Sequence, residues 1–338
     1  MAEKEETRQG GAASARKGAP VVSVRDLSVE YDTGRGVVRA VGGVSFEVRA
    51  GECFALVGES GCGKSTTAAA IMQLVHKPGR VAGGQVLMGG RNLLDLDEDQ
   101  MADVRGSRIG MIFQNPLDSL NPVYTIGDQV VESLVAGGMD RQRAREEAER
   151  ALAEVRIPDV RKRMRQYPHE MSGGMRQRVM IAMMLCRKPE LLICDEPTTA
   201  LDVTTQAGVL ALIDRLRAET GTAVLLITHD FGVVAETADR VGVMYAGRLV
   251  EVGAAAQIFD HPLHPYTRLL MRALPTRTRF EGRLETIQGS VPDLANLPAG
   301  CGFRGRCPLA CERCGSWDYD LREVEDGHYV ACGEVARA

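Results

Sequence analysis

The feature that most constrains this chain is a glycine-rich stretch between an apolar run and a helical run. The letters GESGCGKST follow the apolar residues 54–57 and precede the helical pattern at 67–75. They fit G-x-x-x-x-G-K-[ST], in which backbone N–H groups cradle nucleotide phosphates. Glycine permits the positive φ angles and close backbone approach that such a nest of amides requires. The predicted phosphate site consists of Gly58, Glu59, Ser60, Gly61, Cys62, Gly63, Lys64, Ser65 and Thr66.

Two side chains of this loop define the ligand further. Lys64 can reach the β- and γ-phosphates of a nucleotide, and the Ser65 hydroxyl can ligate Mg²⁺. The helix that follows adds its dipole and its free N–H groups. Cys62 stands near Lys64 and a helix N-terminus, where a lowered thiol pKa would make it sensitive to oxidation; a passive filler of the loop is the alternative. A nucleotide with β- and γ-phosphates, together with Mg²⁺, is therefore the expected ligand.

Length and charge narrow the class of protein. A chain of 338 residues has room for two domains, and its 44% hydrophobic and 25% charged fractions are those of an ordinary soluble globular protein. The net charge of −4 gives no electrostatic reason to expect nucleic acid as a partner. Residues 1–20 lack the apolar core of a signal peptide, and we expect a disordered tail there. No stretch approaches the roughly 18 to 20 apolar residues of a membrane span, so other subunits would have to supply any spans.

The residues ahead of the loop alternate as strands do. Residues 21–31 and 44–49 place apolar and polar side chains on opposite faces, and residues 32–36 form a turn between them. They predict an antiparallel sheet. Tyr31 could stack on a nucleotide base, although a half-buried strand tyrosine is the blander interpretation.

A second anion site is predicted at MSGGMRQR, before the helical run 175–185. Ser172, Gly173 and Gly174 then lie at a helix N-terminus, where backbone N–H groups and the dipole attract phosphate. An ordinary N-cap with a flexible lead-in is the alternative.

Two later apolar strands end in polar residues. Residues 191–196 end in Asp195 and Glu196, and residues 223–228 precede His229. Carboxylates at a strand end are costly to desolvate without a purpose, and in a phosphate-loop fold this edge lies beside the nucleotide. Asp195 would hold Mg²⁺, and Glu196 would polarise the attacking water. The order of elements predicts a doubly wound α/β core with an all-helical insertion, closed by a hairpin about Gly247.

The combination of these motifs resembles the ATP-binding subunit of an ABC transporter, from about Val21 to Glu251. The resemblance implies an A-loop, a Walker A and a Walker B motif, a Q-loop, a signature, a D-loop and a switch histidine. In chain order, the A-loop falls on Tyr31, Walker A on Gly58 to Thr66, the Q-loop on Gln114, the signature on Ser172 to Met175, the end of Walker B on Ile193 to Glu196, the D-loop on Asp202 and the switch histidine on His229. Mg²⁺ would be held by Ser65, Gln114 and Asp195. The signature reads MSGGM where the widespread form reads LSGGQ, a variant similar to that of peptide importers.

The resemblance implies a fold and a mechanism as well. We expect an ABC ATPase domain at 21–258, with an antiparallel β subdomain and a helical subdomain at about 115–175, and an extension at 259–338. Two ATPase subunits, identical or different, would face each other so that the signature of one completes the phosphate site of the other. ATP then joins the two halves, and hydrolysis with Glu196 as base and His229 on the γ-phosphate releases them.

The C-terminal residues 261–275 and 289–308 resemble the tail of the oligopeptide/dipeptide importer branch. This implies ATP-driven peptide uptake at the cytoplasmic face of the inner membrane, with two transmembrane permease subunits and an extracytoplasmic solute-binding protein. Related members import nickel or sugars. The rival hypotheses are a soluble ABC ATPase in DNA repair or translation, and a regulatory partner that does not hydrolyse ATP. The absence of a long coiled coil and of a basic stripe disfavours the former, and the presence of Lys64, Glu196 and His229 disfavours the latter.

Five cysteines are crowded near the C-terminus. Such crowding in an apparently cytosolic chain favours a metal or cluster over disulfides, and four thiolates suit Zn²⁺ or an iron–sulfur cluster. A structural staple for a small tail, without metal, is the alternative. The branch resemblance implies a [4Fe–4S] cluster, with Zn²⁺ still possible because Cys311 forms an extra C-x2-C with Cys314. The implied ligands are Cys301, Cys307, Cys314 and Cys332.

Overall fold

The computed structural model describes residues 18–34, 36–113, 120–198, 203–273, 287–318 and 320–335. The predicted disordered tail therefore lies outside the described residues for positions 1–17, as do Gln114 and Asp202. Within the described ranges, no helix is both long and apolar enough to cross a membrane. The domain boundaries set out above remain a prediction.

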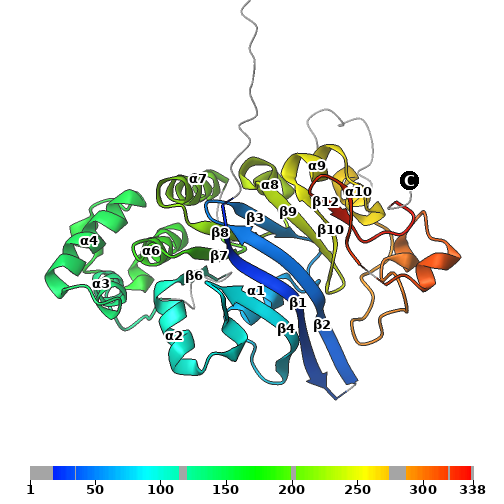
Figure 1. Ribbon diagram of the computed structural model, residues 1–338. Helices are drawn as coiled ribbons and strands as arrows, with labels where there is room; N and C mark the ends of the chain where they lie inside the picture. The colour runs from blue at the N-terminus through cyan, green and yellow to red at the C-terminus, as the bar shows by residue number, and fades with distance from the viewer. Residues whose placement is uncertain are drawn as a thin grey trace, which may run out of the picture.

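An antiparallel sheet forms the first layer (Figure 1). Its strand order is β2-β1-β4-β5. Val44, Phe46 and Val48 pack inward, and Val24 lies opposite Phe46 across the β1–β2 pair, which confirms the predicted antiparallel sheet. The strands are β1 (Pro20–Thr33), β2 (Gly36–Arg49), β4 (Gly79–Met88) and β5 (Arg91–Asn92).

A mixed sheet with the order β11-β12-β10-β9-β3-β8-β7-β6 forms the second layer. The run from β9 to β6 is parallel, and β10, β12 and β11 continue it antiparallel. All five residues of β3, β7 and β8 are buried, as expected for parallel strands covered on both faces. The strands are β3 (Cys53–Val57), β6 (Ile109–Ile112), β7 (Leu191–Asp195), β8 (Ala223–Ile227), β9 (Arg240–Tyr245), β10 (Arg248–Ala254), β11 (Arg322–Glu325) and β12 (His328–Val330).

Helices flank the mixed sheet, and α3, α4 and α6 gather at one side of it (Figure 1). The charged helix α4 belongs to this group because Ala144, Ala148 and Leu152 repeat at helical spacing and are buried. The helices are α1 (Lys64–Ile71), α2 (Glu98–Ser107), α3 (Ile126–Ala136), α4 (Arg141–Glu154), α5 (Val160–Arg163), α6 (Gly173–Leu185), α7 (Val203–Thr220), α8 (Phe231–Thr237), α9 (Ala255–Asp260) and α10 (Pro265–Arg272).

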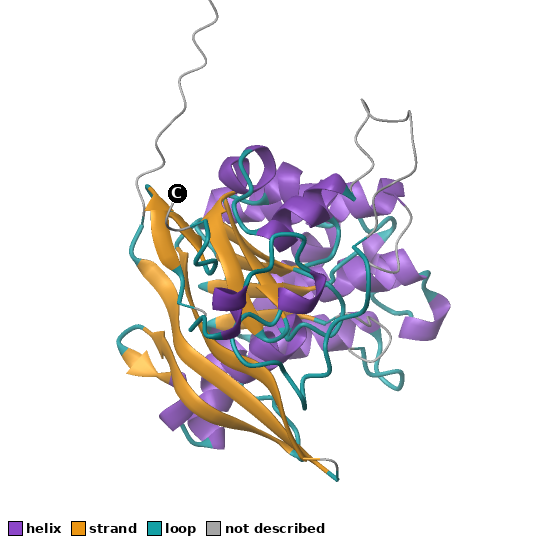
Figure 2. Cartoon of the chain, turned by 90° about the vertical axis from the view of Figure 1, so that its right-hand side faces the viewer, coloured by secondary structure: helices purple, strands orange, loops and turns teal. Residues whose placement is uncertain are grey.

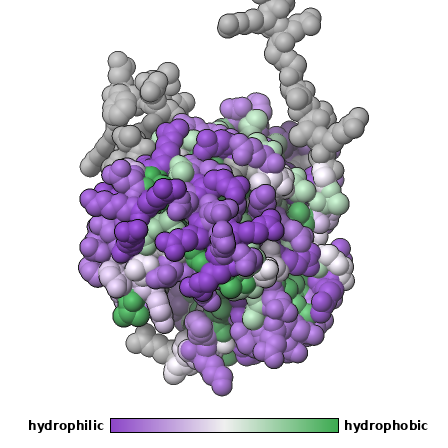
Figure 3. Space-filling model, turned by 90° about the vertical axis from the view of Figure 1, so that its left-hand side faces the viewer, coloured by the Kyte–Doolittle hydropathy of each residue, from purple (hydrophilic) through white to green (hydrophobic). Residues whose placement is uncertain are grey.

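The surface of the helical side is mainly hydrophilic and carries only small apolar patches (Figure 3). Three of the larger apolar side chains that remain exposed, Phe113, Val123 and Tyr124, stand on either side of residues 114–119, with 43%, 70% and 57% of their surface accessible.

The C-terminal residues contain few regular elements (Figure 2). Short 3₁₀ turns lie at Arg304–Arg306 and Glu312–Gly315. The hairpin of β11 and β12 extends the mixed sheet, with Val330 opposite Glu251 of β10. Sequence patterns did not reveal this hairpin, because all four residues of β11 are exposed and show no alternation.

Several predicted elements have different bounds in the structure. The helix after the phosphate loop begins at Lys64 rather than 67 and ends at Ile71 rather than 75. The strand predicted at 44–49 is the end of the 14-residue β2, which begins at Gly36. The hairpin about Gly247 is confirmed, with Ala246 and Gly247 at positive φ angles of 47° and 80° between β9 and β10.

Candidate nucleotide site

The phosphate loop connects β3 to α1 and is held by backbone packing. Gly58 and Gly63 have φ angles of 149° and 104°, and a Cβ at either position would collide with the backbone oxygen of Met244 or of Ala40, respectively. The loop is also tied to the β9–β10 turn, because Gly247 N donates to Cys62 O at 3.0 Å. Glycine is therefore required at both ends of the loop for this conformation.

The loop's lysine lies along the loop itself. Lys64 is buried, and its Nζ donates to the carbonyl oxygens of Gly58 at 2.8 Å and Glu59 at 3.0 Å. Ser60, Gly61 and Ser65 are exposed. The loop therefore presents an accessible outer surface with the cation directly beneath it, a suitable arrangement for polyphosphate.

Cys62 does not have the character of a reactive thiol. Its side chain is fully buried, and burial raises the pKa of the thiol despite the opposing effect of Lys64. The expectation of a lowered pKa is wrong, because desolvation of the thiolate outweighs the nearby positive charge. Cys62 is accordingly a packing residue of the loop.

The end of β7 brings a carboxylate to the start of α1. Ser65 Oγ donates to Asp195 Oδ1 at 3.0 Å, although the two residues lie on different elements. Asp195 is only 6% exposed, and burial raises the pKa of its carboxyl above the usual range, while Ser65 and Lys64 pull it down. A hydroxyl beside a carboxylate offers the oxygen ligands that Mg²⁺ prefers. These two residues fit the predicted metal position.

Glu196 and His229 meet at the same edge of the sheet. Strand β8 pairs with β7 so that Ile227 lies opposite Asp195, and Glu196 N donates to Ile227 O at 2.8 Å. Glu196 has a left-handed φ of 48°, which turns its side chain out of the strand. Its Oε1 lies 3.0 Å from His229 Nδ1. Glu196 is mostly buried and His229 is 60% exposed, so the pair lies at the surface of the edge.

The predicted second anion site is a helix N-terminus, as the sequence indicated. Ser172 is the N-cap of α6, and its Oγ accepts from Met175 N at 3.4 Å. Ser172 and Gly173 are exposed. Among the described residues, no hydrogen bond joins Ser172, Gly173, Gly174 or Met175 to the phosphate loop. The two predicted anion sites thus lie on different elements, at the start of α6 and in the loop before α1.

Tyr31 has the surroundings of a strand tyrosine. It lies in β1 opposite Val38 and Gly79, is half-buried, and packs on the core beneath the antiparallel sheet. Nothing in its contacts assigns it to a base, so its role in stacking remains a prediction.

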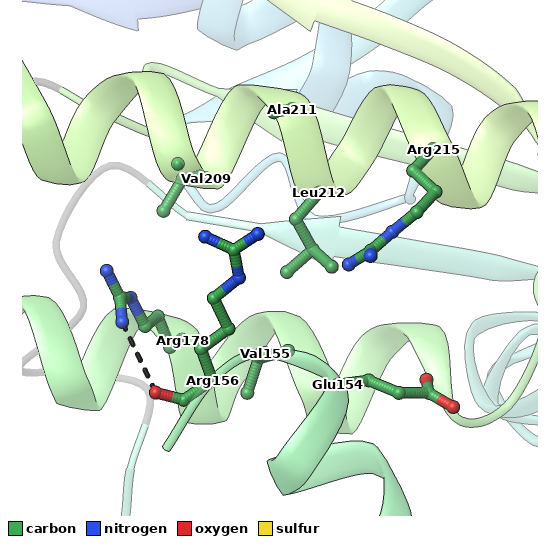
Figure 4. A pocket seen from close by; sticks show the side chains of 9 residues that line it. Glu154, Val155, Arg156, Arg178, Val209, Ala211, Leu212 and Arg215 are labelled. Atoms are coloured by element: carbon green, nitrogen blue, oxygen red, sulfur yellow. Dashed lines mark hydrogen bonds between the residues drawn. The ribbon is translucent and has the colours of Figure 1, made fainter. Parts of the chain in front are cut away.

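The cavity drawn in Figure 4 is a different place from the phosphate loop. It has a volume of about 240 Å³ and lies between α7 and the residues that follow α4, with an apolar floor that includes Val209 and Leu212. Arg156, Arg178 and Arg215 line it, and Arg178 Nη1 donates to Arg156 O at 3.4 Å. None of the predicted nucleotide residues lines this cavity, so it is distinct from the predicted phosphate site.

The C-terminal cysteines lie near one another without forming a ligand set. All five are free thiols, and Cys301, Cys314 and Cys332 line a cavity of about 30 Å³. The two sulfurs of Cys311 and Cys314 are 3.7 Å apart. In the part of the chain that the structure describes, no three His, Cys, Asp or Glu side chains are grouped closely enough to hold a metal ion. Among the described residues the thiols therefore do not form a preassembled ligand set, and no step of the reaction is assigned to a metal or cluster.

Sequence patterns missed two residues that contact the phosphate loop. Tyr266 of α10 accepts a hydrogen bond from Glu59 N at 3.1 Å, and Arg306 forms an ion pair with the Glu59 side chain. Both belong to the extension, more than 200 residues from the loop. Arg306 stands directly before Cys307, and the pattern around it was interpreted as a set of cysteine ligands, so the arginine itself was not singled out.

Family models match two parts of the chain. The model described as ABC transporter matches residues 41–199, and the one described as Oligopeptide/dipeptide transporter, C-terminal region, matches residues 250–314. The first contains the phosphate loop, the signature and the end of β7. The second contains Arg306 and three of the four predicted cysteine ligands.

Curated relatives match nearly the whole chain. A protein of Sinorhizobium fredii, "Probable peptide ABC transporter ATP-binding protein y4tR", is 52% identical over 92% of this chain and 94% of its own length. "Oligopeptide transport ATP-binding protein OppD" of Salmonella typhimurium is 49% identical over 92% of this chain and 93% of its own length.

Solved structures match about seven tenths of the chain. The dimeric post-hydrolysis structure of the ATP-binding cassette MJ0796, bound to ADP and Pi, has a TM-score of 0.63 and 28% identity, covering 69% of this chain and 98% of that one. CbiO1 from Clostridium perfringens, part of an ABC transporter complex, has a TM-score of 0.62 and 26% identity, covering 72% and 91%. Taken with the geometry at the sheet edge, these matches show that the chain belongs to the ABC transporter family and is an ATPase of that family.

Proposed function

We propose that this chain hydrolyses ATP to drive the uptake of peptides through a membrane importer. The observation that carries the proposal is the meeting of Ser65, Asp195, Glu196 and His229 at one edge of the sheet, beside a loop of the phosphate-binding type. The peptide-import names of relatives at about half identity over most of the chain support the substrate class over nickel or sugars, and over a role in DNA repair or translation.

In the proposed mechanism the phosphate loop binds ATP, and the side chains at the sheet edge take part in its hydrolysis. Backbone N–H groups of the loop hold the β- and γ-phosphates, and Lys64 leaves its carbonyl partners to contact them. Ser65 and Asp195, together with Gln114, would hold Mg²⁺, which neutralises charge on the phosphates. Gln114 lies outside the described residues and enters by resemblance alone.

Glu196 is the proposed general base. Its position just past β7, 3.0 Å from His229, allows it to accept a proton from water that attacks the γ-phosphate. His229 orients this carboxylate and donates toward the γ-phosphate. Tyr31 would stack on the adenine, and Asp202, outside the described residues, would contact the partner subunit.

A second ATPase subunit completes the site in this proposal. Ser172, Gly173, Gly174 and Met175 form an exposed helix N-terminus that contacts no residue of its own phosphate loop by a hydrogen bond. An exposed anion site of this kind suits the γ-phosphate bound to another chain. The dimeric form of the MJ0796 cassette is consistent with such a pairing.

Membrane subunits are the remaining proposed partners. Phe113, Val123 and Tyr124 expose apolar surface next to the predicted Q-loop, and this surface is a suitable docking place for permease loops. Two permeases, an extracytoplasmic solute-binding protein and a peripheral position at the cytoplasmic face of the inner membrane are implied by the family resemblance, and relatives named for oligopeptide transport support this part of the proposal.

A metal at the C-terminal cysteines is a finer proposal that rests on spacing and family resemblance. The ligands would be Cys301, Cys307, Cys314 and Cys332, holding [4Fe–4S] or, alternatively, Zn²⁺. Burial raises the pKa of the Cys301 thiol to about 11, so thiolate formation there would need a bound cation. Anaerobic purification with iron, sulfide and zinc analysis tests this, and a protein with none of the three would rule it out.

Replacing the proposed base tests the ATPase mechanism. Glu196→Gln is expected to lower ATP turnover at least about 100-fold, because a general base contributes that much, while ATP affinity stays within about threefold. Glu190→Gln is the matched control at the other end of β7, where the carboxylate only pairs with Arg108 at the surface. Wild-type turnover by Glu196→Gln would remove Glu196 from this role.

Peptide uptake is tested in membrane vesicles that contain the chain and its copurifying membrane subunits. ATP-dependent accumulation of a labelled oligopeptide, lost with Glu196→Gln and kept with Glu190→Gln, is the expected result. Stable association with ribosomes or DNA, without membrane subunits, would favour the rival class instead.

A further inference from the structure

The second residue of the phosphate loop is held by the C-terminal extension from two directions. Arg306 donates to the Glu59 carboxylate through both terminal nitrogens, Nη1 to Oε2 at 2.7 Å and Nη2 to Oε1 at 3.0 Å. Tyr266 accepts from the backbone N–H of the same glutamate at 3.1 Å. A bidentate pair of this kind fixes the orientation of the carboxylate as well as its charge.

Arg306 is itself held rigidly. Its side chain is only 7% exposed, its Nε donates to Gln288 O at 3.0 Å, and Nη1 also reaches Tyr245 Oη at 3.4 Å. The guanidinium lies 5.8 Å from the centre of the Tyr245 ring, which packs on Tyr266 and Phe303. A partly buried, bidentate pair with this many fixed contacts differs from a fully exposed ion pair, whose contribution is small.

The charge of Glu59 explains why such a partner is needed. A carboxylate in a phosphate loop repels the phosphates that the loop binds, and this repulsion grows where water is excluded. Lys64 does not neutralise the Glu59 side chain, because its hydrogen bond goes to the Glu59 carbonyl oxygen. The Arg306 guanidinium is the cation that contacts the carboxylate, and the hydrogen bonds to Glu59 raise the pKa of Arg306 further, so that its charge is permanent.

We infer that Arg306 is a positioning residue for the ATP site. It neutralises Glu59 and holds that carboxylate away from the phosphate-binding amides, so that the extension sets the affinity of the loop for ATP. The inference rests on the proposed role of the loop in ATP binding, and it assigns to residues 287–335 a part in nucleotide binding that the cassette motifs do not include.

Arg306→Met in the full chain tests the inference. The variant keeps most of the apolar stem but leaves the Glu59 carboxylate uncompensated. We expect the KM for ATP to rise about tenfold at low salt, the equivalent of one charge repulsion of about 1.4 kcal/mol, with kcat within about threefold. The increase should shrink at high salt, because ions screen the repulsion.

Removing the charges of Arg306 and Glu59 together tests the inference more sharply than the single variant does. Arg306→Met combined with Glu59→Gln should return the KM to within about threefold of the wild type, since no unpaired carboxylate remains. A merely structural role of Arg306 predicts no such rescue. Arg322→Met is the matched control in the same extension, where the guanidinium stacks on Trp317 at 4.4 Å and lies on the hairpin instead of the loop.

Three results would overturn the inference: an unchanged KM in Arg306→Met, a double variant no better than the single one, or an equal effect in Arg322→Met. Thermal unfolding of each variant identifies loss of fold. If Arg306→Met does not fold, Glu59→Gln supplies the test: the Arg306 charge then lies unbalanced beside the loop, so the KM for ATP should fall by about threefold or more at low salt, and an unchanged KM would overturn the inference. A wild-type chain without ATP turnover would instead overturn the proposed function, so the two failures are distinguishable.

Discussion

Asp195 and Glu251 are both buried carboxylates of the same mixed sheet, but their partners differ. Asp195, at the end of β7, accepts one hydrogen bond, from the Ser65 hydroxyl at 3.0 Å. Glu251, in β10, is fully buried and accepts three, from Leu263 N at 2.7 Å, His264 N at 2.8 Å and His328 Nε2 at 2.8 Å.

The difference separates a binding site from a structural junction. Desolvation without enough donors raises the pKa of Asp195, a cost that the fold accepts at an edge where a cation can bind. Glu251 instead joins β10 to β12 and to the start of α10, so its donors fasten the extension to the sheet. The hydrogen-bond partners therefore indicate that the Asp195 carboxylate is placed to bind a cation and that the Glu251 carboxylate stabilises the fold.

Among substitutions that test this difference between Asp195 and Glu251, the largest expected effect is on the rate of ATP turnover. Asp195→Asn should lower Mg²⁺-dependent ATP turnover at least about 100-fold, because the amide cannot supply the charge that holds the cation. Asp103→Asn, on the exposed face of α2, is the control and should retain wild-type turnover. Turnover by Asp195→Asn at the wild-type rate would mean that Asp195 is not a metal ligand.

The next effect is on stability. Glu251→Gln should lower the free energy of unfolding by about 3 kcal/mol, because it breaks the buried pair with His328 and turns an amide NH₂ toward backbone donors. Urea unfolding followed by circular dichroism measures this. A change no larger than that of the exposed control Glu325→Gln would contradict the structural role.

The smallest of the three effects is a pH dependence at the same junction. Burial lowers the pKa of His264 from 6.5 to about 4, with Arg268 acting in the same direction and Glu251 against it. The unfolded chain then binds the proton more readily, so this residue's contribution is present above pH 6.5 and is lost as pH falls toward 4, by about 2 kcal/mol between pH 7 and pH 5. His264→Asn, which can still accept the hydrogen bond from Tyr266 N, should flatten the acid limb of the stability curve.

A matched control distinguishes the effect of His264 on the acid limb from that of a neighbouring histidine. His261→Asn changes an exposed imidazole three residues earlier and should leave the acid limb as in the wild type. An acid limb unchanged in both variants would show that His264 does not titrate as its burial requires.

Much of the phosphate edge could be predicted from the sequence, and its signals were local. The glycines of the loop, the Ser172 N-cap and the strand ends at Asp195 and His229 each depend on a few neighbouring residues. Parallel pairing then brought the strand ends together, as the order of the elements implied.

The junction with the extension could not be predicted in this way. The pairs Arg306 with Glu59 and His328 with Glu251 join positions 247 and 77 residues apart, and no short pattern encodes them. The hairpin of β11 and β12 gave no alternation, and the cysteine spacing suggested a ligand set that the described thiols do not form. Long-range packing decides this region, so only the three-dimensional structure reveals it.

Thermal unfolding of Asp195→Asn and Glu251→Gln, measured side by side without nucleotide, tests the contrast most directly. Because the pKa of Asp195 is raised on folding, ionising this carboxyl costs more in the folded state than in the unfolded state. Removing the charge should therefore raise the melting temperature. Glu251→Gln should lower it by several degrees, since it leaves buried groups unpaired. A lower melting temperature in both variants would contradict the assignment of Asp195 to binding and Glu251 to the fold.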